Sequence, residues 1–272
     1  MNTITSRHNP VVANFRSAAR TRGATRQHLL LDGVRVIDDA RVAGVQIEVA
    51  ILSAAALQEQ DKAMTRLSRA LVGAGVRTLA ATASVLEAVS PVRTPSGAVA
   101  LATHTPCPYD GVVKQTRQGL VVCPVGVQDP GNIGAIIRAA DAGGARGVVV
   151  VRGSADPFGW RALRGAMGST FRVPVAMADS AESLVQSARS RGIRIVAAVP
   201  RGGTPLYETD LTGPQLLFVG AEGAGLGAHV DTEADIRVSV PMRRRVDSLN
   251  VAVATALIIY EVRRQQSRRA QA

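Results

Sequence analysis

Short apolar runs alternate with amphipathic stretches along this 272-residue chain. In the first hundred residues the apolar runs predict strands, and apolar side chains at helical spacing predict helices between them. The predicted strands are 29–31, 45–52, 76–80 and 98–102, and the predicted helices are 34–43 and 57–74. Strands that alternate with helices in this way are typical of a small α/β unit.

The second half of the chain repeats the alternation in a strand–helix–strand order. An apolar run at 120–127 predicts a buried strand, and residues 133–142 predict a helix, with Asn132 at its N-cap, that ends at Gly143-Gly144. The next strand is predicted at 147–151. Such a βαβ unit implies parallel strands. Later patterns predict a helix at 182–192, strands at 193–199, 217–219 and 238–240, and a last helix after Ser248.

Residues 103–118 interrupt both patterns with prolines, Gly111 and polar side chains. Composition of this kind marks a domain boundary. The predicted organisation is a first domain at 1–105, a linker at 106–117 and a second domain at 118–272.

Several classes of protein find no support in the sequence. No apolar run reaches the roughly 20 residues that a membrane helix needs, and the first residues lack the apolar stretch of a secretory signal. The two cysteines, Cys107 and Cys123, match no metal or disulfide framework. We therefore expect a cytoplasmic protein with no membrane partner and no metal.

The formal net charge is +11, and arginine supplies most of the excess. Arginine pairs with phosphates through its planar fork, so the charge favours a polyanionic partner. A basic protein from an arginine-rich genome would show the same excess, and both interpretations remain open. Five arginines precede the first acid, Asp32, and they form either a solvated helix face or a surface that follows a phosphate backbone: Arg7, Arg16, Arg20, Arg22 and Arg26.

A glycine-rich loop follows the predicted strand at 217–219. Gly220 and Gly223 belong to this loop, whose backbone can bend sharply and lie close to a ligand. Polar groups gather where the loop, the next strand and the last helix meet, namely Glu222, Ser248 and Asn250. A loop–strand–loop–helix series with polar residues only at its junctions predicts a binding or catalytic site.

The same loop formally satisfies a dinucleotide fingerprint, through Gly223, Gly225 and Ala228. That fingerprint normally occupies the first strand–helix turn of its domain and leads straight into a helix. Neither condition holds here, so the sequence disfavours a nicotinamide or flavin site. No P-loop, HExxH or GxSxG pattern is present.

Three separated segments carry more information than any single motif. NIGAIIRAADA, FVGAEGAGLG and VPMRRRVDSLNVAVA, in this order, closely resemble the three motifs of the SpoU (TrmH-like) family. These proteins are AdoMet-dependent RNA ribose 2′-O-methyltransferases of the SPOUT class. The resemblance covers residues 118–263. ITSRHNPVV and LLLDGVRVIDDA are more weakly similar to the L30e-like substrate-binding domain of the ribosomal-RNA members.

The resemblance implies a parallel α/β sheet with a C-terminal trefoil knot, preceded by a small α/β L30e-like domain. It also implies a bent S-adenosylmethionine held by the knot's loops, and a homodimer whose two subunits complete each site. Carried over residue by residue, the cofactor set is Ala198, Val199, Pro200, Gly220, Glu222, Gly223, Val240, Met242 and Leu249. The implied catalytic set is Asn132, Arg138, Glu222, Ser248 and Asn250.

Each polar residue also has a structural interpretation, because Asn132 and Ser248 could cap helices and Asn250 could bond a neighbouring loop. For Arg138 we expect contact with the target's phosphate, since a guanidinium stays protonated and makes a poor base. RNA contacts are expected from six arginines, although Arg243 to Arg245 could instead face only solvent: Arg7, Arg16, Arg22, Arg26, Arg164 and Arg243.

The expected function is methyl transfer from AdoMet to a ribose 2′-hydroxyl in structured RNA, with 23S ribosomal RNA favoured. One alternative is the same reaction on transfer RNA. The other is an RNA-binding protein that keeps the fold without turnover.

Overall fold

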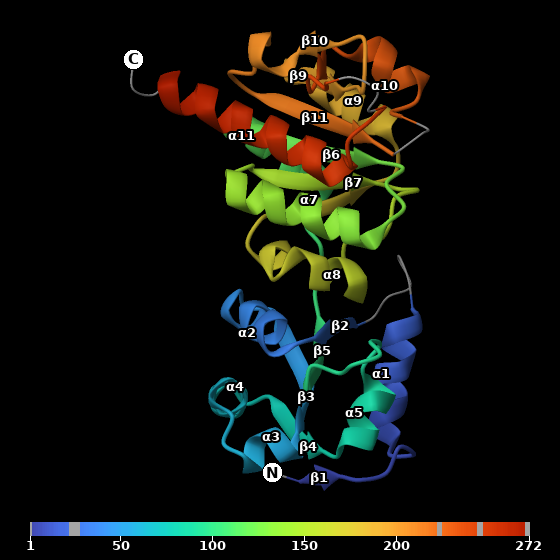
Figure 1. Ribbon diagram of the computed structural model, residues 1–272, viewed down its shortest axis with the longest axis vertical. Helices are drawn as coiled ribbons and strands as arrows, with labels where there is room; N and C mark the ends of the chain where they lie inside the picture. The colour runs from blue at the N-terminus through green and yellow to red at the C-terminus, as the bar shows by residue number, and fades with distance from the viewer. Residues whose placement is uncertain (1, 22–27, 222–224, 244–246, 270–272) are drawn as a thin grey trace. The chain divides into compact units, whose positions relative to one another are not determined.

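The computed structural model describes residues 2–21, 28–221, 225–243 and 247–269 (Figure 1). The chain divides into two compact units. Met1–Thr105 and Phe158–Phe171 form the first, and Pro106–Pro157 and Arg172–Ala272 form the second. Glu222, Gly223, Arg22 and Arg26, all predicted site residues, lie outside the described ranges, as do Arg244 and Arg245.

The first unit contains a five-stranded mixed sheet in the order β1-β4-β3-β5-β2. Its strands are β1 (Thr3–Ile4), β2 (Leu29–Asp32), β3 (Gln46–Ser53), β4 (Arg77–Ala81) and β5 (Ala98–Thr103). Strands β1 and β3 run parallel to β4, whereas β5 runs antiparallel to both β3 and β2. The four strands predicted for this region are confirmed to within one residue at each end.

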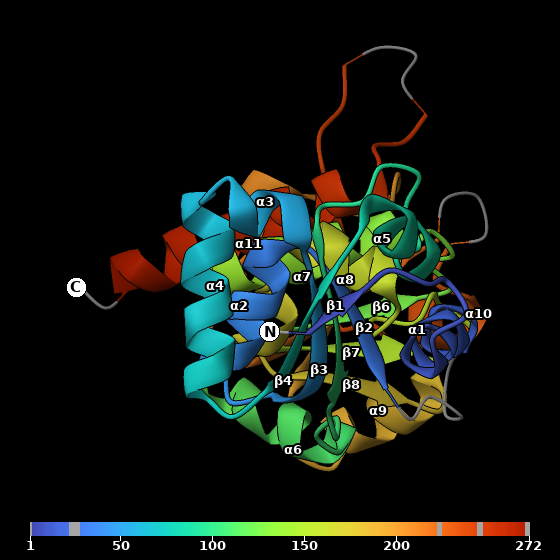
Figure 2. The same ribbon diagram turned by 90° about the horizontal axis from the view of Figure 1, so that it is seen from below.

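Helices cover both faces of this sheet (Figures 1 and 2). α1 (Pro10–Arg20) and α5 (Ala83–Val89) pack on one face, over a core that includes Phe15, Leu30 and Ile51. α2 (Val34–Val42) and α4 (Lys62–Gly73) pack on the other face, with the short α3 (Ala54–Gln58) before α4. The sixth helix, α8 (Trp160–Ala166), packs beside β2.

The predicted helix at 57–74 is wrong in one respect, because the structure divides this stretch into α3 and α4. Gln60 takes a left-handed conformation, with φ of 56°, which ends the helical path. The side chain of Asp61 then caps α4 by accepting a hydrogen bond from the Met64 amide at 2.8 Å. A capping residue inside an amphipathic stretch therefore starts a second helix.

The second unit contains a seven-stranded sheet in the order β10-β12-β9-β11-β6-β7-β8. Its strands are β6 (Leu120–Val125), β7 (Gly147–Val151), β8 (Val175–Ala178), β9 (Arg194–Ala198), β10 (Thr204–Pro205), β11 (Gln215–Gly220) and β12 (Ile236–Ser239). Every pairing in it is parallel, as the βαβ pattern predicted. The carboxyl ends of its strands consequently lie along one edge, where ligands of open parallel sheets bind.

Alternate side chains of these strands face two different sets of helices. Cys123, Leu216 and Phe218 belong to the core that α6 (Tyr109–Lys114), α9 (Ala181–Arg189) and α10 (Ala228–Glu233) cover. α7 (Pro130–Gly143) and α11 (Val251–Arg269) pack against each other. Their approach is close, since a Cβ on Gly143 would collide with Ile259.

The structure differs from the predicted domain organisation in two places. Residues 106–117, predicted as a linker, contain α6, and Val112 and Val113 are fully buried in the core of the second unit. Prolines and Gly111 hid this short helix. The second difference is that Phe158–Phe171 belongs to the first unit, where Trp160 packs against the core under α1. The order of the sequence gives no indication that this later segment packs with the first unit.

Candidate active site

A cavity of about 340 Å³ lies at the carboxyl ends of β9, β11 and β12 in the second unit. Three connecting segments and the first turns of α11 form its walls. Seven of the nine residues predicted for the cofactor line it: Ala198, Val199, Pro200, Gly220, Val240, Met242 and Leu249. β12 ends at Ser239, one residue before the predicted end of that strand, and Val238 within it lines the cavity as well.

The cavity wall beside β11 depends on the absence of side chains. A Cβ on Gly220 would lie 2.5 Å from the carbonyl oxygen of Gly225, so only glycine lets the loop fold back there. Gly225 itself has a φ of +67°, a conformation that disfavours other residues, and its amide donates to the Ala221 carbonyl at 3.1 Å. The loop thereby exposes main chain to the cavity.

Sequence reasoning missed other wall residues, chiefly those from α11. Val251, Ala254, Thr255 and Ile258 line the cavity at helical spacing. The apolar face of α11 reads equally well as ordinary core, so no sequence signal separated the two roles. Since most of the wall is apolar, the cavity suits a ligand with a large apolar surface and a few polar groups.

Asn132 and Asn250 meet beside this cavity, although they are 118 residues apart. The Asn250 Nδ2 donates to the Asn132 Oδ1 at 3.0 Å. The Asn250 Oδ1 accepts from the amides of Ala252 at 3.0 Å and Val253 at 3.3 Å. Asn250 therefore caps α11 and joins it to α7 with one side chain.

The prediction that Asn132 caps its helix is wrong. α7 begins at Pro130, and its cap is Asp129, whose carboxylate accepts from the Gly131 amide at 2.6 Å. Proline suits the first helical position because its missing amide hydrogen has no partner to lose there. Asn132 consequently lies inside the first turn, where its side chain is available to Asn250.

Two further members of the predicted catalytic set, Ser248 and Arg138, lie within the described residues. Ser248 lines the cavity and does not cap α11. Arg138 is exposed on α7, six residues beyond Asn132. At about 100° per residue, that spacing leaves about 120° around the helix axis between Arg138 and Asn132, so the two side chains leave α7 on different faces. Within one copy of the chain, the structure does not bring Arg138 to the asparagine pair.

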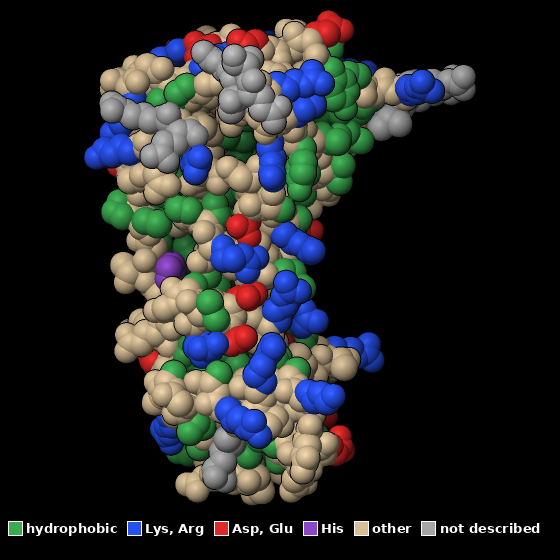
Figure 3. Space-filling model, turned by 90° about the vertical axis from the view of Figure 1, so that its left-hand side faces the viewer, with side chains coloured by type: hydrophobic (Ala, Val, Ile, Leu, Met, Phe, Trp, Pro, Cys, Tyr) green, Lys and Arg blue, Asp and Glu red, His purple; other side chains and the backbone are tan. Residues whose placement is uncertain are grey.

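The predicted RNA-binding arginines have different surroundings. Arg7 and Arg16 are exposed on the first unit, and Arg243 is exposed on the second. Arg164 lies 3.6 Å from the buried Asp32 carboxylate, which also accepts from the hydroxyls of Ser90 and Ser96. On the face that Figure 3 presents, basic side chains lie close to acidic ones.

Other chemistry receives little support from the described residues. Burial raises the pKa of the Cys123 thiol far above its usual range, which makes it a core side chain rather than a nucleophile. No group of three metal-ligating side chains occurs within the described ranges. In the same part of the chain, no helix is long and apolar enough to cross a membrane.

Comparison with known proteins identifies the chain. Residues 119–260 match the SpoU rRNA Methylase family. The chain belongs to this family. One relative, the 23S rRNA guanosine 2′-O-methyltransferase RlmP of Bacillus subtilis, is 34% identical over 70% of this chain and 73% of its own length.

Two solved structures of this family differ in how much of the chain they match. An AdoMet-bound rRNA methyltransferase from Sinorhizobium meliloti superposes with a TM-score of 0.81 at 27% identity, over 97% of each chain. The A. aeolicus TrmH/SpoU tRNA modifying enzyme superposes with a TM-score of 0.50 at 28% identity, over 59% of this chain and 82% of its own. The rRNA enzyme thus matches both units in length.

Proposed function

We propose that this protein transfers a methyl group from S-adenosylmethionine to a ribose 2′-hydroxyl in 23S ribosomal RNA. One observation carries the proposal. The cavity that holds seven predicted cofactor residues is walled by Ser248 and Leu249, and the next residue, Asn250, bonds to Asn132 of the first family motif. A cofactor site and a pair of polar amides are therefore contiguous.

The cavity fits S-adenosylmethionine by size and by chemistry. Its volume of about 340 Å³ falls within the range of small-molecule sites. Main chain around Gly220 lies where a Cβ would fill the space, so amide and carbonyl groups can hold a purine and a ribose. Ser248 and Asp247, whose carboxylate is paired with Arg201, are the polar residues of the described wall. When bound, S-adenosylmethionine supplies an electrophilic methyl group on a sulfonium.

The protein's own contribution is alignment. In-line displacement depends on the position of the attacking oxygen, and holding it in place supplies much of the acceleration. Asn132 and Asn250 each offer amide groups to a ribose at the edge of the cavity, and the apolar walls exclude water from it. Arg138 is assigned to a phosphate of the target, where its charge lowers the cost of forming the alkoxide.

The share of the chain that each solved structure matches favours ribosomal RNA over transfer RNA as the substrate. The tRNA enzyme from A. aeolicus covers only 59% of this chain, whereas the rRNA enzyme from Sinorhizobium meliloti covers 97%. The match to the rRNA enzyme therefore extends over nearly all of this chain, the first unit included. We assign to this unit an L30e-like fold and RNA recognition, and to the second unit a C-terminal trefoil knot around the cofactor cavity.

The α7–α11 surface supports a homodimer. Asn132 and Asn250 line a groove of about 460 Å³ there, together with small alanines and three larger apolar side chains. Those three are exposed to 51%, 38% and 52%, namely Val253, Leu257 and Tyr260. A second copy that covers this surface would bury apolar area beside the asparagine pair. Sedimentation as a monomer at micromolar concentration would contradict the dimer.

The decisive experiment measures methyl transfer from labelled S-adenosylmethionine to RNA from a strain that lacks this gene, with the modified position mapped by ribose-methylation sequencing. We expect one 2′-O-methyl nucleotide in the large-subunit RNA. Label found only in transfer RNA would mean that transfer RNA, and not 23S ribosomal RNA, is the substrate. Cofactor binding without transfer to any RNA, assembly intermediates included, would favour an RNA-binding protein without turnover.

A further inference from the structure

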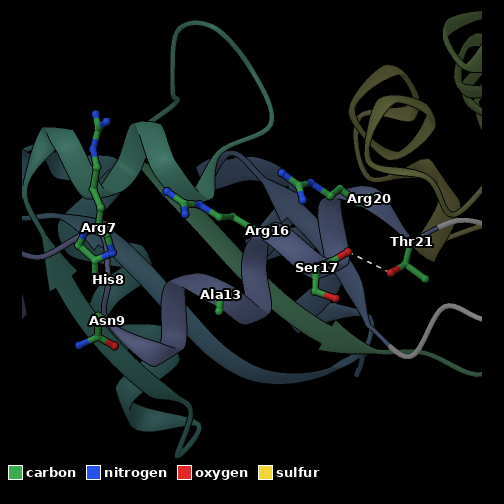
Figure 4. Close-up of a pocket in the computed structure, with 8 residues that line it drawn as sticks. All are labelled: Arg7, His8, Asn9, Ala13, Arg16, Ser17, Arg20 and Thr21. Atoms are coloured by element: carbon green, nitrogen blue, oxygen red, sulfur yellow. Dashed lines mark hydrogen bonds between the residues drawn. The ribbon is translucent and has the colours of Figure 1, made fainter.

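A basic groove lies along α1 in the first unit (Figure 4). Its volume is about 730 Å³. Eight residues from the start of the chain to the end of α1 line it: Arg7, His8, Asn9, Ala13, Arg16, Ser17, Arg20 and Thr21. No acidic side chain is among them.

Helical spacing explains why these residues share one surface. α1 buries Val12, Phe15 and Ala18 against the sheet. Ala13, Arg16, Ser17 and Arg20 occupy the opposite face at intervals of three and four residues. Ala13 is small, which leaves the groove's floor open between the arginines.

Arg7 is paired with Glu87 of α5, whereas Arg16 and Arg20 add charge that no described acid neutralises. Arg16 and Arg20 are four residues apart on one helix, where like charges repel, and α1 contains no acid. Among the described residues, neither has an acidic partner. Figure 4 shows the side chains of Arg7, Arg16 and Arg20 extending to the same side of α1.

Two of the guanidinium groups are held in place from α5. The Arg7 Nε donates to the Ser84 carbonyl at 2.8 Å, and one terminal nitrogen of Arg7 lies 2.6 Å from the Glu87 carboxylate. The Arg16 Nε donates to the Ala88 carbonyl at 3.3 Å. Arg16 lines the groove, and this contact uses only its Nε, which leaves its two terminal nitrogens as donors for an anion. A guanidinium already held in position loses less entropy when it binds a phosphate.

We propose that this groove binds the sugar–phosphate backbone of the substrate RNA and adds affinity without reading its sequence. The inference rests on the proposed function only in taking RNA as the substrate. Arginines, hydroxyls and the Asn9 amide are the groups that contact phosphate and sugar. Among the described lining residues His8 has the only aromatic ring, and the others are arginines and small or polar side chains, which favours backbone contact over base stacking.

A second basic surface of the same unit provides a matched control. Lys62, Arg66 and Arg69 line an open groove of about 620 Å³ along α4, on the other face of the sheet. There Arg66 lies 4.0 Å from the Asp38 carboxylate, which Arg41 also contacts at 2.8 Å. Acidic neighbours lower the attraction of this surface for an anion. Removing Arg66 and Arg69 changes the net charge by the same two units as removing Arg16 and Arg20, but we expect little effect on RNA binding.

The experiment measures binding of the full chain to two RNA hairpins of equal length and unrelated sequence, between 0.05 and 0.3 M salt. For the Arg16→Ala/Arg20→Ala variant we expect the slope of log K against log salt to fall by about two, and affinity at 0.15 M to fall about 30-fold, if each arginine neutralises one phosphate. Both hairpins should lose affinity equally. Arg66→Ala/Arg69→Ala should leave the slope and the affinity unchanged.

Three further readouts separate this inference from its alternatives. An unchanged unfolding transition in Trp160 fluorescence shows that the first unit of the variant is folded, because Trp160 packs against its core. Arg16→Lys/Arg20→Lys should restore the salt slope. A variant slope equal to that of the wild type, or a loss confined to one hairpin, would overturn the proposal. Methyl transfer by the wild type is a separate measurement. If the wild type methylates no RNA but the variant still loses the salt slope, the proposed function is refuted and the groove assignment stands.

Discussion

Asn250 combines a structural and a functional role in one side chain. Its oxygen caps α11, and its amide nitrogen donates to Asn132. Asn250→Asp keeps the capping oxygen and removes the donor, so we expect unfolding stability near that of the wild type but methyl transfer lowered about tenfold or more, from the lost alignment of Asn132. Asn250→Ala should lose activity and also about 1 kcal/mol of stability.

Urea unfolding and methyl-transfer rates of the two variants test this division. Equal loss of stability in both would assign the capping effect to something other than the side-chain oxygen. Full activity in Asn250→Asp would remove the asparagine pair from the catalytic account.

His104 makes the stability of the first unit depend on pH. Its ring lies 5.3 Å from the Phe158 ring and 6.1 Å from the Phe171 ring, and burial lowers its pKa below 6.5. The unfolded chain therefore takes up a proton at higher pH than the folded one. Stability is unaffected by this group well above pH 6.5 and is lost as pH falls through 6.5 toward the folded pKa.

The prediction is a difference between two proteins. Between pH 7.5 and pH 5.5, the wild type should lose more free energy of unfolding than His104→Asn, which has no proton to take up. Chemical denaturation at both pH values measures this. A larger loss in the variant would reverse the sign of the assignment.

At the scale of elements, the loop after β11 is the most sequence-constrained part of the cofactor cavity. In Gly220→Ala the new methyl group would press against the main chain of Gly225, so the loop must shift. Overpacking of this kind costs about 1–3 kcal/mol, and if the loop must return to its original position to hold the cofactor, that cost corresponds to roughly 5- to 150-fold weaker S-adenosylmethionine binding. Calorimetric titration measures the change.

Gly111→Ala is the control for that variant. Nothing lies within 4 Å of a Cβ at Gly111, which is on α6 of the same unit. We expect its cofactor affinity to match the wild type. If Gly220→Ala bound equally well, the loop would not approach the cofactor.

The elements also show what the sequence could predict. Strands with continuous apolar runs, such as β7, were predicted to the residue because a fully buried parallel strand has no polar positions. Helix α6 escaped prediction, since its two buried valines lie in a segment rich in proline. The asparagine contact could not be predicted by spacing, because it depends on how α7 and α11 pack.

At the scale of the whole molecule, the position of Arg138 bears on the homodimer. Arg138 and Asn132 leave α7 about 120° apart around the helix axis, so we expect that one copy does not present both side chains to one ribose. If both act on the same nucleotide, they must come from two copies of the chain. The α7–α11 surface, with Leu257 and Tyr260 exposed, lies beside Asn132 and is where we expect the second copy.

Complementation between inactive variants tests this arrangement. Arg138→Ala and Asn132→Ala should each abolish most methyl transfer. In mixed dimers of the two, one site receives Asn132 from one copy and Arg138 from the other and is intact, whereas the second site lacks both. Random association makes half of the dimers mixed, so about a quarter of wild-type activity should return. Purification of mixed dimers through two different tags should raise it to about half. If no activity returned in tagged mixed dimers, both residues would have to serve the site of their own copy, and the geometry of α7 would then require Arg138 to act away from the ribose.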